Sequence, residues 1–483
     1  MHFIVKFFPE ITIKSPPVRK RFVKHLRDNL RQLFKALPFP VKVDREWDKI
    51  DVYADLETPE AIAQVTQILA NTPGIASFAQ VQTFPLGDLE DIFQKTKAIW
   101  GDALAGKTFC VRVKRSGDHD FSSIEVERYV GGGLNQYTDA AGVKLKKPDI
   151  TVRMEIKRDQ LHVIETQTKG LGGFPLGTQE PVLSLVSGGF DSTVSSYLTI
   201  KRGIRTHYCF FNLGGRAHEV GVKEVAYYLW NKFGASHRVM FVTVPFEDVV
   251  GEILQKVDNS QMGVVLKRMM LRAATQVAEK MEIPALVTGE AVAQVSSQTL
   301  TNLTVIDSVT DTLTLRPLIV MDKGDIIDIA RDIGTEEFSA AIPEYCGVIS
   351  RKPTTRAQED RIVHEESKFD MAVLQKAVDT RRMVAIDDVV YDLDEEVKVD
   401  VSDQVSLDQV IIDVRHPDEE ELRPLQLEGA TILKVPFYRL STEFAQLDKA
   451  KHYLLYCEKG IMSQLHAANL KDEGYDNLGV YRP

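Results

Sequence analysis

The segment Ser187-Gly-Gly-Phe-Asp-Ser192 constrains the fold of this chain more than any other. It follows the apolar run Pro181–Val186, which predicts a buried strand, and it precedes a helical pattern that begins at Thr193. A strand, a glycine-rich turn and a helix in that order direct backbone N–H groups and the positive end of a helix at a phosphate. The segment lacks the Gly-Lys-Ser/Thr ending of a Walker loop, so it does not favour transfer of a γ-phosphate. Such a turn also arises by chance, so the rest of the sequence has to show whether this one binds a phosphate.

The residues after Pro181 alternate between strand and helix patterns. This alternation predicts a parallel, doubly wound sheet, in which ligands bind at the carboxyl ends of the strands. The turn at Ser187–Ser192 lies at such an end. Aromatic, glycine and polar residues follow the other strands, in the segments Cys209–Gly215, Thr288–Glu290 and Gln294–Gln298. Lys267 and Arg268 are expected to begin a helix and to meet phosphates. The strands are expected near 182–186, 205–211, 238–244 and 285–288.

The N-terminal part of the chain is basic. Residues 1–50 carry twelve Lys and Arg against five Asp and Glu, although the whole chain has a net charge of −10. A basic end of this kind suggests contact with a polyanion, and solvated helix faces are the alternative. Strand and helix patterns alternate here in two small α+β modules, with a basic helix at 17–37 and a helix that we expect to end at Val130. Lys144, Lys146 and Lys147 then mark the turn into an extended strand.

The C-terminal part follows an acidic segment near 388–404, which we interpret as a hinge. A short α/β unit then begins with a strand that holds Asp413-Val-Arg415. It later contains the strand Tyr453–Tyr456 and the loop Cys457-Glu-Lys-Gly-Ile-Met-Ser463, which opens a helix. A thiol in such a loop meets backbone N–H groups and a helix N-terminus, and both favour the thiolate.

The other cysteines differ in their surroundings. Cys346 lies between Pro343 and Gly347, which predicts an irregular loop suited to a reactive thiol, whereas Cys110 and Cys209 lie inside apolar strands and are expected in the core. The spacing matches neither a disulfide framework nor a metal site, so no metal ligand is predicted. The N-terminus resembles neither a signal peptide nor a membrane span, and the cytoplasm is the expected location.

Three segments resemble known families. Ser187–Ser192 resembles the pyrophosphate loop of PP-loop ATP pyrophosphatases, the segment that contains Lys144–Lys147 resembles the RNA-binding THUMP domain, and the loop of Cys457 resembles a rhodanese persulfide loop. Many rhodanese loops carry arginines where this chain has Glu458 and Met462, which favours sulfur delivered by a protein. We therefore expect an α/β and α+β multidomain protein, with a ferredoxin-like module (1–60), a THUMP domain (61–167), an adenylation domain (178–388) and a rhodanese domain (404–483).

This combination resembles the long form of the tRNA 4-thiouridine synthetase family over essentially the whole chain. The resemblance implies ATP and Mg²⁺ as cofactors, tRNA bound through Lys144, Lys146 and Lys147, and catalytic roles for Asp191, Cys346 and Cys457. It also implies a cysteine desulfurase as persulfide donor and a sulfur-carrier protein of thiazole synthesis as a partner, without membrane contact. The sequence does not reveal the oligomeric state, for which a homodimer is one option. The residues expected at the ATP site are Leu185, Val186, Ser187, Gly188, Gly189, Asp191, Ser192, Phe210, Phe211, Lys267, Gly289, Gln298 and Lys323.

The reaction that the resemblance implies begins with attack of the uridine C4 oxygen, at position 8 of tRNA, on the α-phosphate of ATP. Persulfide sulfur from Cys457 then replaces the adenylated oxygen, and Cys346 completes sulfur release as a disulfide with Cys457. Two other functions remain open. One is a stand-alone ATP-dependent amidase or synthetase, against which the loop of Cys457 counts. The other is a tRNA-binding or sulfur-carrying scaffold without catalysis, against which the intact Ser187–Ser192 turn counts.

Overall fold

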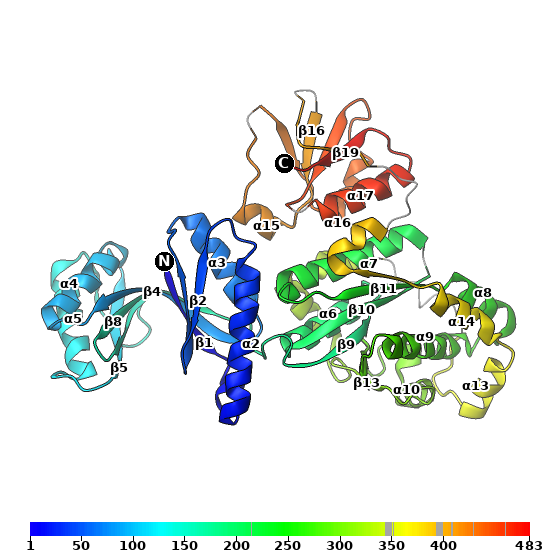
Figure 1. Ribbon diagram of the computed structural model, residues 1–483, viewed down its shortest axis with the longest axis horizontal. Helices are drawn as coiled ribbons and strands as arrows, with labels where there is room; N and C mark the ends of the chain where they lie inside the picture. Colours follow the sequence, from blue (N-terminus) through cyan, green and yellow to red (C-terminus); the bar gives the residue numbers. More distant parts are fainter. Residues whose placement is uncertain are drawn as a thin grey trace. The chain divides into compact units, whose positions relative to one another are not determined.

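The computed structural model describes residues 1–213, 215–342, 350, 352–392, 399–406, 409–427, 429–458 and 460–483. The chain divides into two compact units, Met1–Pro175 and Leu176–Pro483. Three β-sheets form the framework: one of eight strands in the first unit, and one of six and one of five strands in the second (Figure 1). Among the described residues, no helix is both long enough and apolar enough to cross a membrane.

The first unit is built on one continuous sheet in the order β2-β3-β1-β4-β8-β7-β5-β6. The long strand β4 pairs with β1 along one edge and with β8 along the other, so it belongs to both small modules predicted from the sequence. The strands are β1 (His2–Phe7), β2 (Val41–Arg45), β3 (Lys49–Ala54), β4 (Ile75–Pro85), β5 (Thr108–Ser116), β6 (Gly142–Val143), β7 (Ile150–Lys157) and β8 (Gln160–Lys169).

Four helices cover one face of this sheet. Phe78 packs with α2 and α3, and Val163 packs with α4 and α5, whereas their neighbours Ala79 and Ile164 form a small cluster on the opposite face. Because successive side chains of a strand point to opposite faces, both helix pairs lie on the same side. The helices are α2 (Pro16–Phe34), α3 (Pro59–Asn71), α4 (Leu89–Trp100) and α5 (Ser123–Tyr137), with short helical turns at α1 (Pro9–Thr12) and η1 (Asp102–Leu104).

Helix α5 does not end at Val130 as the sequence suggested, but continues through three glycines to Tyr137. The reason is close packing against α4. A Cβ atom on Gly133 would lie 2.6 Å from the ring of Phe93, so a glycine at this position allows the two helices to approach. The glycine run therefore marks a helix–helix contact and not a turn.

The second unit contains the predicted doubly wound sheet, in the order β13-β12-β9-β10-β11-β14. Its strands are parallel except β14, which pairs antiparallel with β11 at the edge and was not anticipated. On β10, Cys209 and Phe211 face one core while Tyr208 and Phe210 face the other, so both faces are covered by helices. The strands are β9 (Gln179–Leu185), β10 (Ile204–Asn212), β11 (Met240–Pro245), β12 (Ala285–Val287), β13 (Leu313–Leu315) and β14 (Arg382–Ala385).

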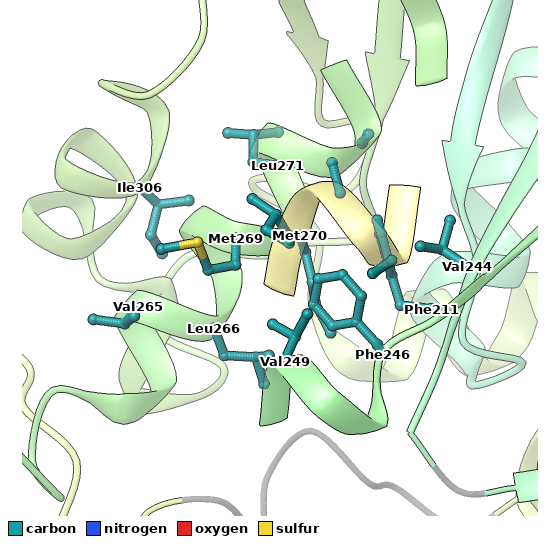
Figure 2. Close-up of a cluster of buried hydrophobic side chains, with 14 of the residues drawn as sticks. Phe211, Val244, Phe246, Val249, Val265, Leu266, Met269, Met270, Leu271 and Ile306 are labelled. Carbon is teal, nitrogen blue, oxygen red and sulfur yellow. The ribbon is translucent and has the colours of Figure 1, made fainter. Parts of the chain in front are cut away.

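Helix α9 lies at the centre of one of these cores. Figure 2 shows Leu266, Met269 and Met270 of α9 beside Phe246 and Phe211. This helix begins at Met262, so Lys267 lies in its second turn and not at its start. The helices around the sheet are α6 (Phe190–Lys201), α7 (Gly215–Leu229), α8 (Glu247–Lys256), α9 (Met262–Lys280), α10 (Leu300–Asp307), α11 (Lys323–Ile333), α12 (Glu336–Ala341), α13 (Glu359–Glu366) and α14 (Met371–Asp379), with shorter turns η2 (Trp230–Gly234), η3 (Ser296–Gln298) and η4 (Ile386–Asp392).

The C-terminal part of the second unit forms a parallel sheet in the order β15-β19-β18-β16-β17. Its central strands β16 and β18 are apolar, as expected for strands buried on both faces. The elements are β15 (Val401–Ser402), β16 (Gln409–Asp413), α15 (Pro417–Leu422), β17 (Thr431–Lys434), α16 (Phe437–Phe444), β18 (His452–Tyr456), α17 (Ile461–Asp472) and β19 (Leu478–Tyr481).

We predict opposite effects of two neighbouring substitutions in α5. Gly133→Ala should lower the local free energy of unfolding by about 1–3 kcal/mol, because the new methyl group meets the Phe93 ring. Gly132→Ala should raise it by about 0.5–1 kcal/mol, because a Cβ there meets nothing within 4 Å and alanine favours a helix interior. Hydrogen exchange of α4 and α5 in the full chain measures both, and equal protection in the two variants would contradict this account.

Candidate functional site

The turn between β9 and α6 has the geometry of a phosphate cradle. Gly188 has a φ of +82°, and a Cβ atom there would lie 2.5 Å from Cδ1 of Ile342, so both backbone conformation and space require glycine. The Ser187 N–H donates to Oγ of Ser192 (3.2 Å), which in turn donates to the Gly189 carbonyl (3.1 Å). Helix α6 begins directly after Gly189, and the first N–H groups of a helix have no acceptor within the helix. The turn therefore presents donors to an anion.

A cavity of about 270 Å³ opens at this turn, at the carboxyl ends of β9, β10 and β12. Its apolar wall includes Leu266 and Met270, which connect the cavity to the core of α9. The structure brings ten of the predicted ATP-site residues together in the cavity wall: Leu185, Val186, Ser187, Gly189, Asp191, Ser192, Phe211, Lys267, Gly289 and Gln298.

Three predicted residues do not line the cavity. Phe210 is 1% exposed and faces the opposite core, because it alternates with Phe211 along β10. Gly188 is closely packed against Ile342, which lines the cavity in its place. Lys323 contacts the cavity wall through Asp191, because its Nζ lies 2.9 Å and 3.1 Å from the two carboxylate oxygens of that residue.

Asp191 is the polar centre of the cavity wall. Besides the ion pair with Lys323, its Oδ2 accepts a hydrogen bond from Gln294 (2.8 Å). The end of β12 approaches it from the other side, where a Cβ atom on Gly289 would lie 2.5 Å from the backbone carbon of Asp191. The absence of a side chain at Gly289 thus allows the segment that follows β12 to touch the phosphate turn.

Sequence reasoning missed a second set of charged groups in the wall. The Arg316 guanidinium donates to Glu290 (2.9 Å) and to both oxygens of Asp307 (2.5 Å and 2.9 Å). Burial alone would lower the pKa of Arg316, but these carboxylates raise it above its ordinary value. His218, on α7, also lines the cavity and donates to the Ser187 carbonyl (3.2 Å). Arg316 follows a strand of only three residues, so no sequence pattern indicated its position.

Arg268 does not reach the cavity, contrary to our expectation. It is 3% exposed, and its guanidinium forms a two-pronged ion pair with Glu366 (2.7 Å and 2.9 Å) and donates to Ser308 (2.9 Å). A buried guanidinium with these partners ties α9 to α13 and α10. Its role is structural.

Of the two cysteines predicted to transfer sulfur, only Cys457 lies within the part of the chain that the structure describes. Cys346 lies outside the described residues, and the described residues on either side of its segment, Ile342 and Ser350, both line the cavity. Cys457 follows β18 directly and precedes α17, as the sequence indicated. Cys110 and Cys209 are buried, which confirms their placement in the core.

The Cys457 thiol is 6% exposed. The Ser463 N–H approaches its Sγ to 3.3 Å, and Oγ of Ser463 lies 3.4 Å away. Burial nevertheless raises the pKa of Cys457 above its ordinary value and outweighs these hydrogen bonds. The loop supplies the expected N–H group, but the described conformation favours the neutral thiol.

Two ion pairs lie around this loop. Asp413 and Arg415 form a buried pair with two hydrogen bonds (2.9 Å and 2.5 Å), and the Arg415 guanidinium lies 5.0 Å from the centre of the Tyr456 ring. Glu458, at the position where many rhodanese loops have arginine, instead pairs with Arg423. The sequence motif Asp413-Val-Arg415 therefore supports the strand end that carries the cysteine.

In the first unit, Lys144, Lys146 and Lys147 are exposed on the turn between β6 and β7. The Arg112 guanidinium reaches the same turn, where it donates to the Leu145 carbonyl (3.4 Å). Arg112 also lines a groove of about 210 Å³ on the helix-free face of the sheet. The other charged residues of this groove are Lys6, Lys114, Arg153 and Glu155, of which Lys6 and Glu155 form an ion pair.

Comparison with known families accounts for each part of the chain. Residues 2–79 match the ferredoxin-like domain of the thiamine biosynthesis protein ThiI, 87–164 match the THUMP domain, 177–371 match ThiI itself, and 395–482 match the rhodanese-like domain. The tRNA sulfurtransferase of Saccharophagus degradans is 59% identical over 483 residues, and that of Shewanella loihica is 57% identical over 484, with all of each chain covered.

Solved structures agree with this assignment. A 4-thiouridine synthetase in complex with RNA and ATP is similar over 80% of this chain and 99% of its own, with a TM-score of 0.70 and 25% identity. PH1313 from Pyrococcus horikoshii shares the fold over 69% of this chain and 100% of its own, with a TM-score of 0.54 and 17% identity. The matches define a multidomain sulfurtransferase that combines a THUMP domain with a rhodanese domain, and they confirm the predicted fold class. The chain belongs to the tRNA sulfurtransferase family.

We predict that Cys457 titrates above the ordinary thiol range of about 8.5. Burial disfavours the thiolate, so the thiolate population should grow only as the pH rises past that value. The ultraviolet thiolate absorbance of the wild type minus that of Cys457→Ser measures this titration. A midpoint below about 8 would show instead that the loop stabilises the thiolate.

Proposed function

We propose that this chain uses ATP to adenylate the C4 oxygen of a tRNA uridine, at position 8, and then replaces that oxygen with sulfur carried by Cys457. The observation that carries the proposal is the phosphate turn of Ser187–Ser192, which opens into a cavity with an apolar wall. The uridine oxygen is a poor leaving group, so adenylation is needed before sulfur can displace it. Its attack on the α-phosphate of ATP releases pyrophosphate, and the later attack of sulfur on C4 releases AMP.

The cavity suits ATP in two respects. Its wall has the N-terminal N–H groups of α6 and the ammonium of Lys267, which are suited to stabilise the charge of the leaving pyrophosphate. The wall also has apolar residues and Gln298, whose Oε1 is buried without a hydrogen-bond partner among the described residues. An amide oxygen there is suited to accept a hydrogen bond from the exocyclic amine of adenine, which guanine lacks at that position. The similar synthetase structure, which holds ATP, supports this assignment.

Mg²⁺ fits the same cavity, because Asp191 presents carboxylate oxygens at the phosphate turn and Mg²⁺ prefers oxygen ligands shared with phosphates. The ion would neutralise phosphate charge when bound. In the described structure Lys323 and Gln294 hold this carboxylate. We therefore assign Lys323 and Gln294 the role of orienting Asp191 toward the nucleotide.

For sulfur transfer, we propose that Cys457 receives a persulfide sulfur from a cysteine desulfurase and passes it to the activated uridine. Cys346 would then form a disulfide with Cys457, which a cellular reductant resets. The position of Ile342 and Ser350 in the cavity wall supports this role, because Cys346 is only four residues from each of them. A family model described as a thiamine biosynthesis protein also supports a second use of this sulfur, for the thiazole of thiamine through a sulfur-carrier protein. A cytoplasmic location and a homodimer remain predictions.

We propose that tRNA binds the first unit through the lysine turn and the adjoining groove. Both carry net positive charge, and the groove lies on the sheet face that no helix covers. Cations in this arrangement match the phosphate backbone of RNA. The THUMP match and the RNA-bound synthetase structure support this placement.

Two glycine substitutions test the adenylation site. Gly289→Ala should reduce tRNA-dependent pyrophosphate release roughly 10²-fold, because displacement of a reacting group by about 1 Å costs that much. Gly263→Ala should leave it unchanged, because Gly263 also lines the cavity but a Cβ there meets nothing within 4 Å. Asp191→Ala should abolish pyrophosphate release, and all three variants should keep the tRNA affinity of the wild type. Normal pyrophosphate release by Asp191→Ala would exclude the proposed site.

Charge reversal tests the RNA surface. Changing Lys144, Lys146 and Lys147 to Glu should weaken tRNA binding and reduce the slope of log K against log salt by about one for each lost phosphate contact. Arg112→Glu should act in the same direction, whereas Lys449→Glu in the rhodanese domain is a control for net charge. Filter binding at several salt concentrations gives both quantities. An unchanged affinity and slope in the triple variant would mean that these lysines are ordinary surface charge and that the basic helix α2 is the better candidate.

A further inference from the structure

The rhodanese domain rests on a defined surface of the adenylation domain. Figure 1 shows α17 beside α7, and two polar contacts join them: Asp472 forms an ion pair with Arg216, and Nε2 of His466 faces Oε1 of Glu224. His466 and Glu224 are both buried, so this pair lies inside the contact and not at its edge. The order of the pairs means that α17 runs antiparallel to α7.

Aromatic residues extend this contact beyond the two helices. The ring of Phe437, at the start of α16, lies 4.6 Å from that of Phe338 on α12. His416, before α15, lies 5.5 Å from Tyr228 on α7 and 5.8 Å from Phe338. Residues of both domains thus form one continuous apolar cluster. A contact with a packed apolar centre, one buried polar pair and one partly exposed ion pair has the character of a specific interface.

This contact places Cys457 near the C-terminal part of α7, whereas the cavity lies near the N-terminal part of the same helix. His218, in the first turns of α7, lines the cavity, whereas Cys457 shares its buried cluster with Tyr227, nine residues further along. At 1.5 Å per residue, nine helical residues span about 13 Å. The pKa of Tyr227 is raised by burial and, secondarily, by the nearby Cys457, in agreement with their proximity. In this position the thiol is covered and remote from the phosphate turn.

We propose that the surface of α7 and α12 is a docking site for the rhodanese domain in its reduced form, and that uptake of one sulfur atom by Cys457 releases the domain from it. The proposal rests on the sulfur-carrying role proposed above for Cys457. The docked domain is then a resting state, and the loaded domain is free to carry sulfur to the cavity.

The chemistry of loading explains the release. The Cys457 thiolate attacks the outer sulfur of a protein persulfide, a new S–S bond forms on Cys457, the donor's S–S bond breaks, and the donor cysteine leaves as a thiolate. The docked thiol is covered, so this attack takes place while the domain is briefly undocked, and the loaded Cys457 would then have to return to a place where it is only 6% exposed. An extra atom in a packed core forces its neighbours apart, and a persulfide anion is disfavoured there because burying a charge without a partner is unfavourable. Both effects act against the docked state and leave the free domain unaffected.

Hydrogen exchange measured by mass spectrometry tests this directly. The full chain carries Cys346→Ser, which prevents a disulfide with Cys457, and glutathione persulfide serves as the sulfur donor. After the Cys457 peptide gains the mass of one sulfur, exchange in α7 and α17 should become roughly tenfold faster, as expected for one overpacked atom. Exchange in α9, which lies in a separate core, should stay unchanged. The same treatment of a Cys457→Ser chain should change none of the three helices.

Loss of the buried pair should release the domain without sulfur. Glu224→Gln should increase the rate at which N-ethylmaleimide alkylates Cys457 by roughly tenfold or more, because a buried polar group that loses its partner disfavours the docked state. Asp379→Asn, which removes an exposed pair with Lys280 elsewhere in the adenylation domain, should leave that rate unchanged. Slow exchange in α9 of each variant shows that the adenylation domain is still folded.

The outcomes separate this inference from the proposed function. If Cys457 gains sulfur while α7 and α17 keep their protection, docking does not depend on loading and this inference is wrong, although Cys457 remains the sulfur carrier. If Cys457 gains no sulfur from glutathione persulfide, its proposed role fails and the inference fails with it. Equal alkylation rates in the wild type and Glu224→Gln would exclude the buried pair as the contact that holds the domain.

Discussion

The close approach of two backbones governs the cavity at the phosphate turn. The end of β12 touches the first turn of α6 because Gly289 has no side chain, and the phosphate turn closes against Ile342 because Gly188 has none. These two contacts bring Asp191, Lys323 and Gln294 into one hydrogen-bonded group, although they come from separate parts of the chain. The cavity exists because its walls meet at glycines, and the apolar core of α9 holds those walls in place.

The loop of Cys457 depends on close packing by large side chains and not on glycines. Around Cys457 the neighbours are large and apolar, and the loop is closed by Ser463 and covered by residues of the same cluster on α7. A thiol in this setting is protected and weakly acidic. The two sites therefore differ in how they handle their reactants. The cavity at the phosphate turn is open and preformed, whereas Cys457, which we propose as the sulfur carrier, is buried in a packed interface and has to leave it in order to react.

Local patterns in the sequence predicted what is local in the structure. The strand, turn and helix around Ser187–Ser192 are contiguous, so the phosphate turn and most of the cavity wall could be anticipated, as could the loop of Cys457. The sequence could not decide between Phe210 and Phe211, because the choice depends on which face of β10 meets the cavity. It also missed Arg316, whose hydrogen-bond partners are distant in the sequence. It predicted too low a pKa for Cys457, because the helix that helps to bury this thiol lies about 230 residues earlier in the chain.

The shared strand β4 has a consequence for how the first unit engages RNA. Because β4 is hydrogen-bonded on both edges, the basic helix α2 and the lysine turn at β6 and β7 belong to one eight-stranded sheet and not to two tethered modules. Seven spacings of about 4.8 Å separate its outer strands by roughly 34 Å along the sheet. Strand pairing thus fixes the distance between these two basic surfaces, and any ligand that contacted both would meet them at that distance. An insertion in a loop would leave that distance unchanged, whereas an added or lost strand would reset it.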